Sequence, residues 1–296
     1  MRLLIIGASG FIGSHLYDLA VSRGFEVVGT RCGKPDPRLI KFDLVADSIT
    51  ELVKNQFYGS SDICAVICAA NPKIEWCCSQ KELSYNLNVT STIRVIEELS
   101  LMGIKCAFLS SDYVFDGKHG YYDETIIPSP TTEYGRQKAE VERYIIKNYP
   151  RNLVLRLSMT VGDSPSENHL FARWYENVAA LEPINCIEGQ VFAPTFVDDV
   201  CQAIIKALER DLCGLYNLCN SEFFNRGELA KQFMIALTGT SNVVNMPFSA
   251  FGFSEERPLL TYLDGSKLRG AIDMQFTSMR EVFKRLKNKA EFFTLG

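Results

Sequence analysis

The chain has 296 residues, 47% of them hydrophobic and 22% charged, with a formal net charge of −4. This is the composition of a globular protein long enough for one large core or two domains. It excludes a general electrostatic attraction to nucleic acid or anionic membranes, and no run approaches the roughly 20 apolar residues of a spanning helix.

The first half of the chain alternates two kinds of pattern. Apolar, β-rich runs predict strands at 2–7, 25–30, 39–44, 63–70, 104–111 and 152–158. Helical patterns lie between most of them, at 11–22, 47–57, 79–101 and 132–148. Strands separated by helices indicate βαβ units, and nearly uniform apolar strands indicate a sheet covered on both faces. The predicted class is α/β, with a doubly wound parallel sheet of the Rossmann type.

The second half is less regular. Residues 162–168 have the composition of a loop, and a helix is predicted at 168–180. Another helix lies within 194–210, with Asp198 and Asp199 in its first turn. A strand is predicted at 214–219, and helices near 226–238 and 278–289. We expect a Rossmann domain over 1–160, to which 190–220 return, and a smaller substrate-binding domain mainly over 161–296.

No special role is predicted for the cysteines, the histidines or the N-terminus. Ten cysteines are scattered without paired CxxC motifs, and the three histidines lack ligand spacing, so no metal site is predicted. Adjacent Cys77 and Cys78 leave a redox pair open, but reduced thiols in a cytoplasmic protein are favoured. The opening "MRLLIIGASG" fits a first strand better than a signal peptide, because its apolar run is short.

Glycines 7, 10 and 13 have the spacing GxxGxxG between the first strand and the first helix. Such glycines allow a tight turn, close approach of a pyrophosphate, and close packing of helix on strand. The pattern predicts a dinucleotide site, with a merely structural turn as the alternative. The second strand ends at Thr30 and Arg31 without a carboxylate, which favours the 2′-phosphate of NADP(H), although NAD(H) stays compatible. The alternative for Arg31 is a solvated loop residue.

The helix at 132–148 carries a lysine on its apolar side. Tyr134, Lys138, Val141 and Ile145 fall within about 40° of one another, opposite Arg136, Glu140, Arg143 and Lys147. A buried lysine is costly unless its charge is used; the alternative is a side chain that reaches out to water.

A chemical use for this lysine follows from the glycine loop. We expect Lys138 to lower the pKa of Tyr134, which makes the phenol a proton donor near neutral pH, and to bind the nicotinamide ribose. Ser111, preferred over Ser110, ends the strand at 104–111 and would stabilise a substrate oxygen.

Together with the glycines, "SSDYVFDG", "YGRQK", "GQVFAPTFVDDV" and "ERPLLTYLDGSKL" resemble the dTDP-4-dehydrorhamnose reductase family of extended short-chain dehydrogenases/reductases. The resemblance runs to about residue 269 and implies that Ser111, Tyr134 and Lys138 are catalytic. It implies substrate contacts at Ser111, Asp112, Asn168 and Arg257, although the last two could be a cap and a surface charge. The predicted cofactor contacts are Gly7, Gly10, Phe11, Ile12, Gly13, Thr30, Arg31, Asp43, Leu44, Ala69, Ala70, Asn88, Tyr134 and Lys138.

Some positions depart from the family. Gln137 stands where serine is common, and residues 71–80, "NPKIEWCCSQ", are less typical, so the sugar-contacting loop is expected to differ. The second carboxylate of related dehydratases is missing, because Tyr113 follows Asp112.

The function this implies is the NADPH-dependent reduction of the 4-keto group of a nucleotide-activated deoxysugar. Two alternatives stay open: a nucleotide-sugar epimerase, and a non-catalytic NADP-binding regulatory subunit like the β subunit of methionine adenosyltransferase. The expected partner is a nucleotide sugar, with no nucleic acid and no membrane. The helical stretch 79–101 is compatible with a homodimer face.

Overall fold

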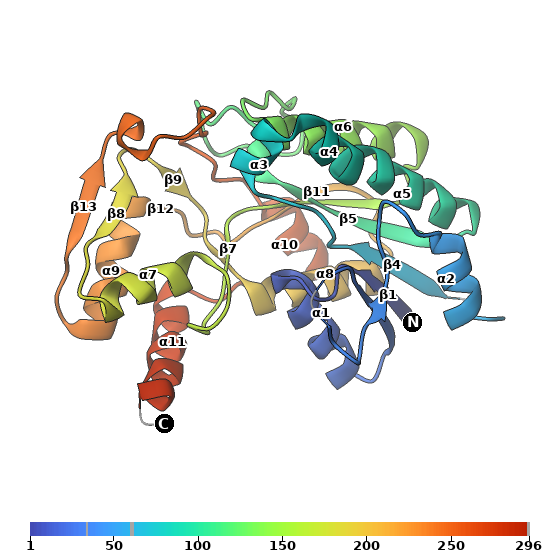
Figure 1. Ribbon diagram of the computed structural model, residues 1–296, viewed down its shortest axis with the longest axis horizontal. Coiled ribbons are helices and arrows are strands. Elements are labelled where there is room, and N and C mark those ends of the chain that lie inside the picture. The colour runs from blue at the N-terminus through green and yellow to red at the C-terminus, as the bar shows by residue number, and fades with distance from the viewer. Residues whose placement is uncertain (34, 60–61, 295–296) are drawn as a thin grey trace.

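The computed structural model describes residues 1–33, 35–59 and 62–294. A parallel sheet of seven strands, in the order β11-β6-β5-β4-β1-β2-β3, forms the centre of the larger lobe (Figure 1). Its strands are β1 (Arg2–Ile6), β2 (Glu26–Arg31), β3 (Ile40–Lys41), β4 (Ile63–Ile67), β5 (Lys105–Ser111), β6 (Leu153–Leu157) and β11 (Gly214–Leu218). The sheet pairs strands from both halves of the sequence, because β11 adds to β6 in parallel.

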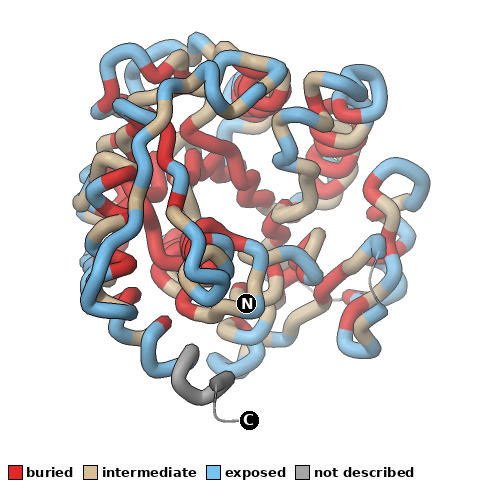
Figure 2. Tube along the Cα trace, turned by 60° about the vertical axis from the view of Figure 1, so that its left-hand side comes forward, coloured by how far each residue is buried: buried red, intermediate tan, exposed pale blue. Residues whose placement is uncertain are grey.

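Helices cover both faces of this sheet. They are α1 (Phe11–Ser22) and α8 (Val197–Glu209) on one face, and α2 (Ile49–Gln56), α5 (Thr92–Leu101) and α6 (Glu133–Asn148) on the other. Alternate residues of β1 serve the two cores: Leu3 and Ile5 pack with α1 and α8, and Leu4 and Ile6 with the other three helices. Buried stretches gather inside the molecule and exposed ones on its outer turns (Figure 2). The predicted α/β class with a doubly wound sheet is confirmed.

A second lobe packs around an aromatic core. Phe171, Trp174, Phe233 and Phe283 lie with ring centroids 5.2–5.6 Å apart. The elements outside the central sheet in the second half are β7 (Thr160–Val161), α7 (Leu170–Ala179), β8 (Ile184–Ile187), β9 (Val191–Phe192), β10 (Thr195–Phe196), β12 (Phe224–Asn225), α9 (Arg226–Thr238), β13 (Val243–Met246), a 3-10 turn (Phe248–Phe251), α10 (Ser266–Ile272) and α11 (Met279–Thr294). Most of these strands have only two residues, which is too short for a periodic pattern, and the sequence did not predict them.

Side-chain caps fix where several helices begin. Ser48 and Thr132 accept hydrogen bonds from the backbone three residues on, and Asn225 accepts them two and three residues on. Gly239, with φ of 79°, ends α9 in the left-handed conformation. Helix α1 differs, because its N-cap is Gly10 and makes no side-chain cap. The amide groups of its first turn are therefore not satisfied in that way.

Two predicted elements are wrong in extent. The strand predicted at 39–44 contains only the two residues of β3. The single helix predicted at 79–101 is divided into α4 (Lys81–Tyr85), a π-helical turn (Asn86–Ser91) and α5. A short helix that was not predicted, α3 (Ile74–Ser79), precedes it. A 3-10 turn at Asp112–Val114 follows β5. The π turn coincides with Asn88, whose side chain bonds the backbone of Asn71. Apolar spacing does not report such a polar contact.

A buried ion pair joins α6 to the sheet. The Arg156 guanidinium, from β6, donates to both carboxylate oxygens of Glu142 at 2.8–3.1 Å, and Ser110 donates to the same carboxylate. The guanidinium carbon also lies 4.9 Å from the centroid of the Phe115 ring. Both charged side chains are about 2% exposed. Removing one partner would leave an uncompensated charge in the core.

We therefore expect Glu142→Gln to lower the free energy of unfolding by about 3 kcal/mol or more. The measurement is urea unfolding followed by circular dichroism. The matched control is Glu140→Gln on the same helix, where the carboxylate accepts a hydrogen bond from Tyr85 near the surface. This control should cost less than about 1 kcal/mol. Equal losses in the two variants would contradict a special role for the buried pair.

Candidate active site

The loop after β1 can be built only with glycine at two positions. Gly7 has φ of +90°, and a Cβ atom there would lie 2.7 Å from the backbone nitrogen of Ala69. A Cβ atom at Gly13 would lie 2.2 Å from the Gly7 carbonyl oxygen. The Gly7 amide donates to Thr30 Oγ1 at 3.0 Å, which ties the loop to β2. The backbone thus comes close to two neighbouring strands and leads directly into the uncapped start of α1.

The other predicted cofactor residues border the same edge of the sheet. Arg31 ends β2, and its guanidinium donates to the carbonyl oxygens of Gly33 and Asp36. Asp43 follows β3 and accepts from the Val45 amide. Leu44 is buried. Ala69 follows β4, and its amide donates to the Ile6 carbonyl. Ala70, Phe11 and Ile12 are half-buried in the adjoining segments.

Lys138 faces the interior, as the helical stripe predicts. Its amine donates to the Leu109 carbonyl of β5 at 2.8 Å and lies 4.5 Å from the centroid of the Phe108 ring. The Tyr134 ring centroid is 5.8 Å from the same amine. Burial lowers the pKa of Lys138 to about 8, and the Glu142 carboxylate opposes this shift. The lysine therefore does not extend to water, which was the alternative.

Ser111 and Ser110 point in different directions, as successive residues of a strand do. The Ser111 hydroxyl donates to the Asp112 carboxylate at 3.0 Å, accepts from the Tyr113 amide at 3.2 Å, and also hydrogen-bonds to Tyr134. The Ser110 hydroxyl instead donates to the Glu142 carboxylate. Of the two serines, Ser111 is the one beside the tyrosine.

The pKa of Tyr134 moves in the direction opposite to the prediction. Burial raises the pKa of the phenol, the Asp112 carboxylate raises it further, and the hydrogen bond with Ser111 lowers it by less. The expected lowering by Lys138 was therefore wrong, because the amine is committed to Leu109 and the phenol is enclosed. Burial also raises the pKa of Asp112 to about 7, so this carboxyl titrates near neutral pH.

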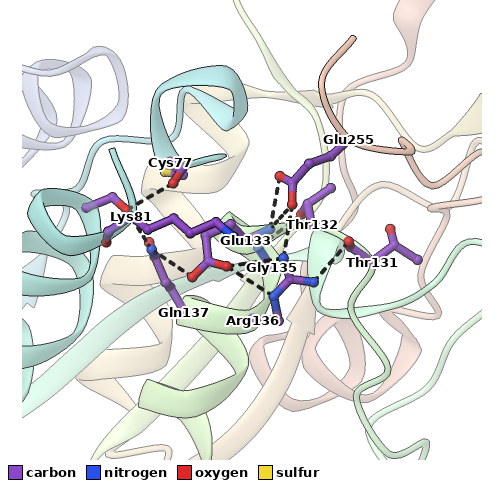
Figure 3. A network of polar contacts seen from close by, with 10 residues as sticks. Cys77, Lys81, Thr131, Thr132, Glu133, Gly135, Arg136, Gln137 and Glu255 are labelled. Atoms are coloured by element: carbon purple, nitrogen blue, oxygen red, sulfur yellow. Dashed lines mark hydrogen bonds and ion pairs between the residues drawn. The ribbon is translucent and has the colours of Figure 1, made fainter. Parts of the chain in front are cut away.

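A polar network positions the start of α6 (Figure 3). Glu255, from the segment between the 3-10 turn and α10, accepts from the Glu133 amide at 2.9 Å and from Arg136 at 3.0 Å. On the other side, Gln137 donates to Ser84 Oγ at 2.8 Å, and Ser84 donates to the Cys77 and Lys81 carbonyls. The helix that carries Tyr134 is thus held from both sides.

Asn88 belongs to this network. Its side chain accepts from the Asn71 amide at 3.0 Å, and donates to the Asn71 carbonyl and to Gln137 at 3.1 and 2.8 Å. Gln137 therefore has a defined structural role at the position where the resembled family often has serine. Cys77, the buried member of the vicinal pair, donates to the same Asn71 carbonyl.

The two remaining predicted substrate residues, Arg257 and Asn168, differ in their surroundings. Arg257 forms an ion pair with Glu75 at 2.5 Å, packs on Phe253, and hydrogen-bonds to Tyr113. The Tyr113 ring lies 6.4 Å from that of Tyr134, so Arg257 adjoins the candidate site. Asn168 is exposed on the loop before α7.

The sequence missed a residue that anchors this loop. His15, on α1, bonds Asp198 at 3.0 Å and Glu167 at 2.9 Å. These two hydrogen bonds raise the pKa of His15 to about 9, so the imidazole is positively charged at neutral pH. Nothing in the local sequence signals the contact, since its partners are 152 and 183 residues away.

The described residues contain neither a cluster of metal-ligating side chains nor a membrane-spanning helix. Over 1–33, 35–59 and 62–294, no group of three or more histidine, cysteine or acidic side chains is arranged to hold a metal ion. Within the same part of the chain, each helix is too short or too polar to span a bilayer.

Comparison with known proteins gives relatives over most of the length of the chain. The family model described as RmlD substrate binding domain matches residues 1–291. Methionine adenosyltransferase 2 subunit beta of Xenopus tropicalis is 27% identical over 278 residues, 90% of this chain and 81% of the relative. dTDP-4-dehydrorhamnose reductase of Aggregatibacter actinomycetemcomitans is 24% identical over 304 residues, 98% of this chain and 99% of the relative. The solved dTDP-4-dehydrorhamnose reductase of Bacillus anthracis, in complex with NADP, has a TM-score of 0.83 at 24% identity, covering 96% of this chain and 98% of that one. The structural likeness establishes the shared fold.

The raised pKa of Asp112 predicts a pH-dependent stability. The folded protein keeps a proton on Asp112 that the unfolded chain releases, so this stabilisation is present below about pH 4 and is lost as the pH rises through about 7. Asparagine has no such loss. The free energy of unfolding of Asp112→Asn relative to the parent should rise by about 2.5 kcal/mol between pH 5 and pH 8, measured by urea unfolding.

The control for this experiment is Asp116→Asn. Backbone and side-chain hydrogen bonds from Lys118 and Tyr122 lower the pKa of Asp116 despite its burial, so it stays ionised across pH 5–8. Its difference from the parent should be constant over that range. A constant difference for Asp112→Asn as well would show that Asp112 does not titrate there.

Proposed function

The chain belongs to the RmlD substrate binding domain family, and from this premise we propose that it is an NADPH-dependent reductase of the 4-keto group of a nucleotide-activated deoxysugar. The observation that carries the proposal is the inward-facing Lys138, which lies beside Tyr134 and Ser111 at the sheet edge where the glycine loop opens. A buried amine is costly, so its retention next to a phenol and a hydroxyl favours a chemical role over a packing one.

The residues present fit a dinucleotide. Gly7 and Gly13 keep side chains away from the loop, and α1 begins without a side-chain cap, which leaves its first amides for a phosphate. Arg31 at the end of β2 suits the 2′-phosphate of NADP(H), and the hydroxyl of Thr30 already holds the loop. The Bacillus anthracis structure with NADP supports the same choice. NAD(H) remains compatible with the loop itself.

The proposed chemistry uses three side chains. NADPH, when bound, supplies the hydride to the carbonyl carbon. Tyr134 retains its proton at neutral pH, since its pKa is raised, and donates it to the carbonyl oxygen as negative charge develops there. The Ser111 hydroxyl, which here donates to the Asp112 carboxylate, would turn its proton toward the same oxygen. Lys138, one turn from Tyr134, would hold the ribose of the bound cofactor with the donors that the Leu109 carbonyl does not use.

A second candidate function is supported by the curated relatives. The Xenopus tropicalis chain is 27% identical and is a subunit of methionine adenosyltransferase 2. A chain of this kind would bind a cofactor and act through a partner enzyme. Co-purification of a stoichiometric partner, with no NADPH oxidation on a panel of dTDP-, GDP- and UDP-4-keto sugars, would favour it. An epimerase would instead retain tightly bound NAD after purification.

Tyr134→Phe tests the proton path. We expect the variant to bind NADPH as the parent does and to lose turnover by on the order of 10²–10³, because the donor hydroxyl is removed. NADPH binding is followed by fluorescence and turnover by absorbance with the sugar-nucleotide panel. Tyr144→Phe removes a hydroxyl from the same helix, where it contacts Glu97, and should keep full turnover. Turnover by Tyr134→Phe at the parental rate would rule out this residue as the donor.

Arg31→Ala tests the choice of cofactor. Loss of the guanidinium should weaken NADPH binding by roughly 10-fold or more, as expected for a charge-assisted contact with phosphate, and leave NADH binding unchanged. Titration of both nucleotides into both proteins measures this. A parallel change for NADPH and NADH would mean that Arg31 does not distinguish them.

A further inference from the structure

Asp112 is a buried carboxyl group at the start of the 3-10 turn that follows β5. Its side chain hydrogen-bonds to the hydroxyls of Ser111 and Thr261. In the part of the chain that the structure describes, the cations that form ion pairs do so with other carboxyl groups. Within that part, therefore, no ion pair offsets the cost of burying a negative charge on Asp112.

Other ionisable groups face Asp112 from the elements packed against it. Three of them are acids, on the same turn, on α6 and after β11: Tyr113, Tyr134 and Cys219. Burial is the main cause of the raised pKa of each acid, and the Asp112 carboxylate raises the three pKa values further. Two cations lie beyond them, because Arg257 hydrogen-bonds to Tyr113 and Arg269 to the Cys219 carbonyl. The three acids are therefore neutral at neutral pH, and Asp112 is the acid of this cluster that titrates there.

The hydroxyl of Ser111 has only one proton to donate, since a serine hydroxyl carries one donor and two acceptor sites. It accepts from the Tyr113 amide at 3.2 Å and donates to the Asp112 carboxylate at 3.0 Å. An ionised carboxylate can only accept hydrogen bonds, so an ionised Asp112 keeps the proton of Ser111. In this arrangement Ser111 has no donor for a substrate oxygen beside Tyr134.

Protonation of Asp112 would reverse this hydrogen bond. A neutral carboxyl group has an O–H donor, which the second acceptor site of Ser111 Oγ can receive once Tyr134 donates to the substrate. The Ser111 proton can then point to the substrate oxygen, where negative charge develops during hydride transfer. Burial raises the pKa of Asp112 to about 7, so both arrangements are accessible near neutral pH.

We infer that Asp112 is a positioning residue that controls the donor direction of the Ser111 hydroxyl: protonated Asp112 releases the Ser111 proton to the substrate oxygen, and ionised Asp112 withholds it. The inference rests on the proposed function and adds a control of its rate by pH. Asp112 forms and breaks no bond to the substrate. Its proton stays on the carboxyl group, and the proton that the substrate receives still comes from Tyr134.

The first experiment compares the pH profiles of kcat/KM for the parent and Asp112→Asn, with NADPH and a 4-keto sugar nucleotide. Between pH 6 and pH 8 the protonated fraction of a group with a pKa of about 7 falls about 10-fold. The amide of Asp112→Asn can donate to Ser111 at every pH, so the ratio of variant to parent should rise about 10-fold over this range. Lys138, whose pKa is about 8, is present in both proteins and cancels in the ratio. A ratio that stays constant would overturn the inference.

Variants of Ser111 test whether Asp112 acts through that hydroxyl. Ser111→Ala should be slow, and adding Asp112→Asn to it should leave its pH profile unchanged, because there is no proton to redirect. Ser111→Thr keeps a hydroxyl and should keep the pH dependence of the parent. The matched control is Asp116→Asn, which should follow the parental profile because Asp116 stays ionised across this range. A 10-fold change of the ratio in the Ser111→Ala background as well would overturn the inference.

Infrared spectroscopy tests the hydrogen bond without turnover, and so separates the inference from the proposed function. The difference spectrum between the parent and Asp112→Asn should contain the C=O band of a protonated carboxyl group at pH 6 and lose it at pH 8. Ser111→Ala should shift this band, because the acid loses its acceptor. If an active parent lacks the band at pH 6, or Ser111→Ala leaves it in place, the inference alone fails. If the band behaves as expected but no sugar nucleotide is reduced, the proposed function fails and the reversal of the hydrogen bond is supported.

Discussion

The position of one buried amine governs the arrangement of the candidate site. Lys138 lies between the Leu109 carbonyl, the Phe108 ring and the phenol of Tyr134, and none of these contacts is available unless α6 packs tightly across β5. The Glu142–Arg156 pair, one turn further along α6, holds the helix against the neighbouring strand β6 and supplies the carboxylate nearest to the lysine. The ion pair that stabilises the fold and the amine of the candidate site are therefore close together. A change in the charge of one will alter the electrostatic environment of the other, because electrostatic interactions are poorly screened in the interior.

The architecture could be predicted from the sequence because it depends on local signals. Apolar strands alternating with helices, and glycines at 7, 10 and 13, report a doubly wound sheet and its ligand-binding edge. The spacing of Tyr134 and Lys138 on one helical stripe, taken together with the glycine loop, predicted the buried position of the lysine. The family resemblance drawn from "DYVFDG" and "LDGSKL" agrees with the family model that matches residues 1–291. Assignment of the individual site residues and of the domain boundary remains a prediction.

What could not be predicted depends on contacts between distant segments. His15 contacts carboxylates on α8 and on the loop before α7, and Glu142, on α6, contacts an arginine on β6. The residues next to His15 or Glu142 in the sequence therefore give no indication of either contact. The direction of the Tyr134 pKa was mistaken for a related reason. The sequence indicates that a lysine is near the phenol, but the sign of the pKa shift depends on how far the phenol is enclosed. Burial is the largest influence on the Tyr134 pKa, and it raises it. The π-helical turn at Asn86–Ser91 follows from a side chain that serves the backbone of another segment.

The order of strands in the sheet also constrains how the chain is made. Strand β6 is fully buried between β5 and β11, yet β11 is not synthesised until residue 218. During translation the sheet therefore exists for some sixty residues with an apolar strand at an open edge, the kind of edge that pairs with other chains. Helix α8, which covers one face, is completed only shortly before β11. Nascent chains of this protein are consequently exposed to misassociation while the ribosome is translating the first part of the second lobe.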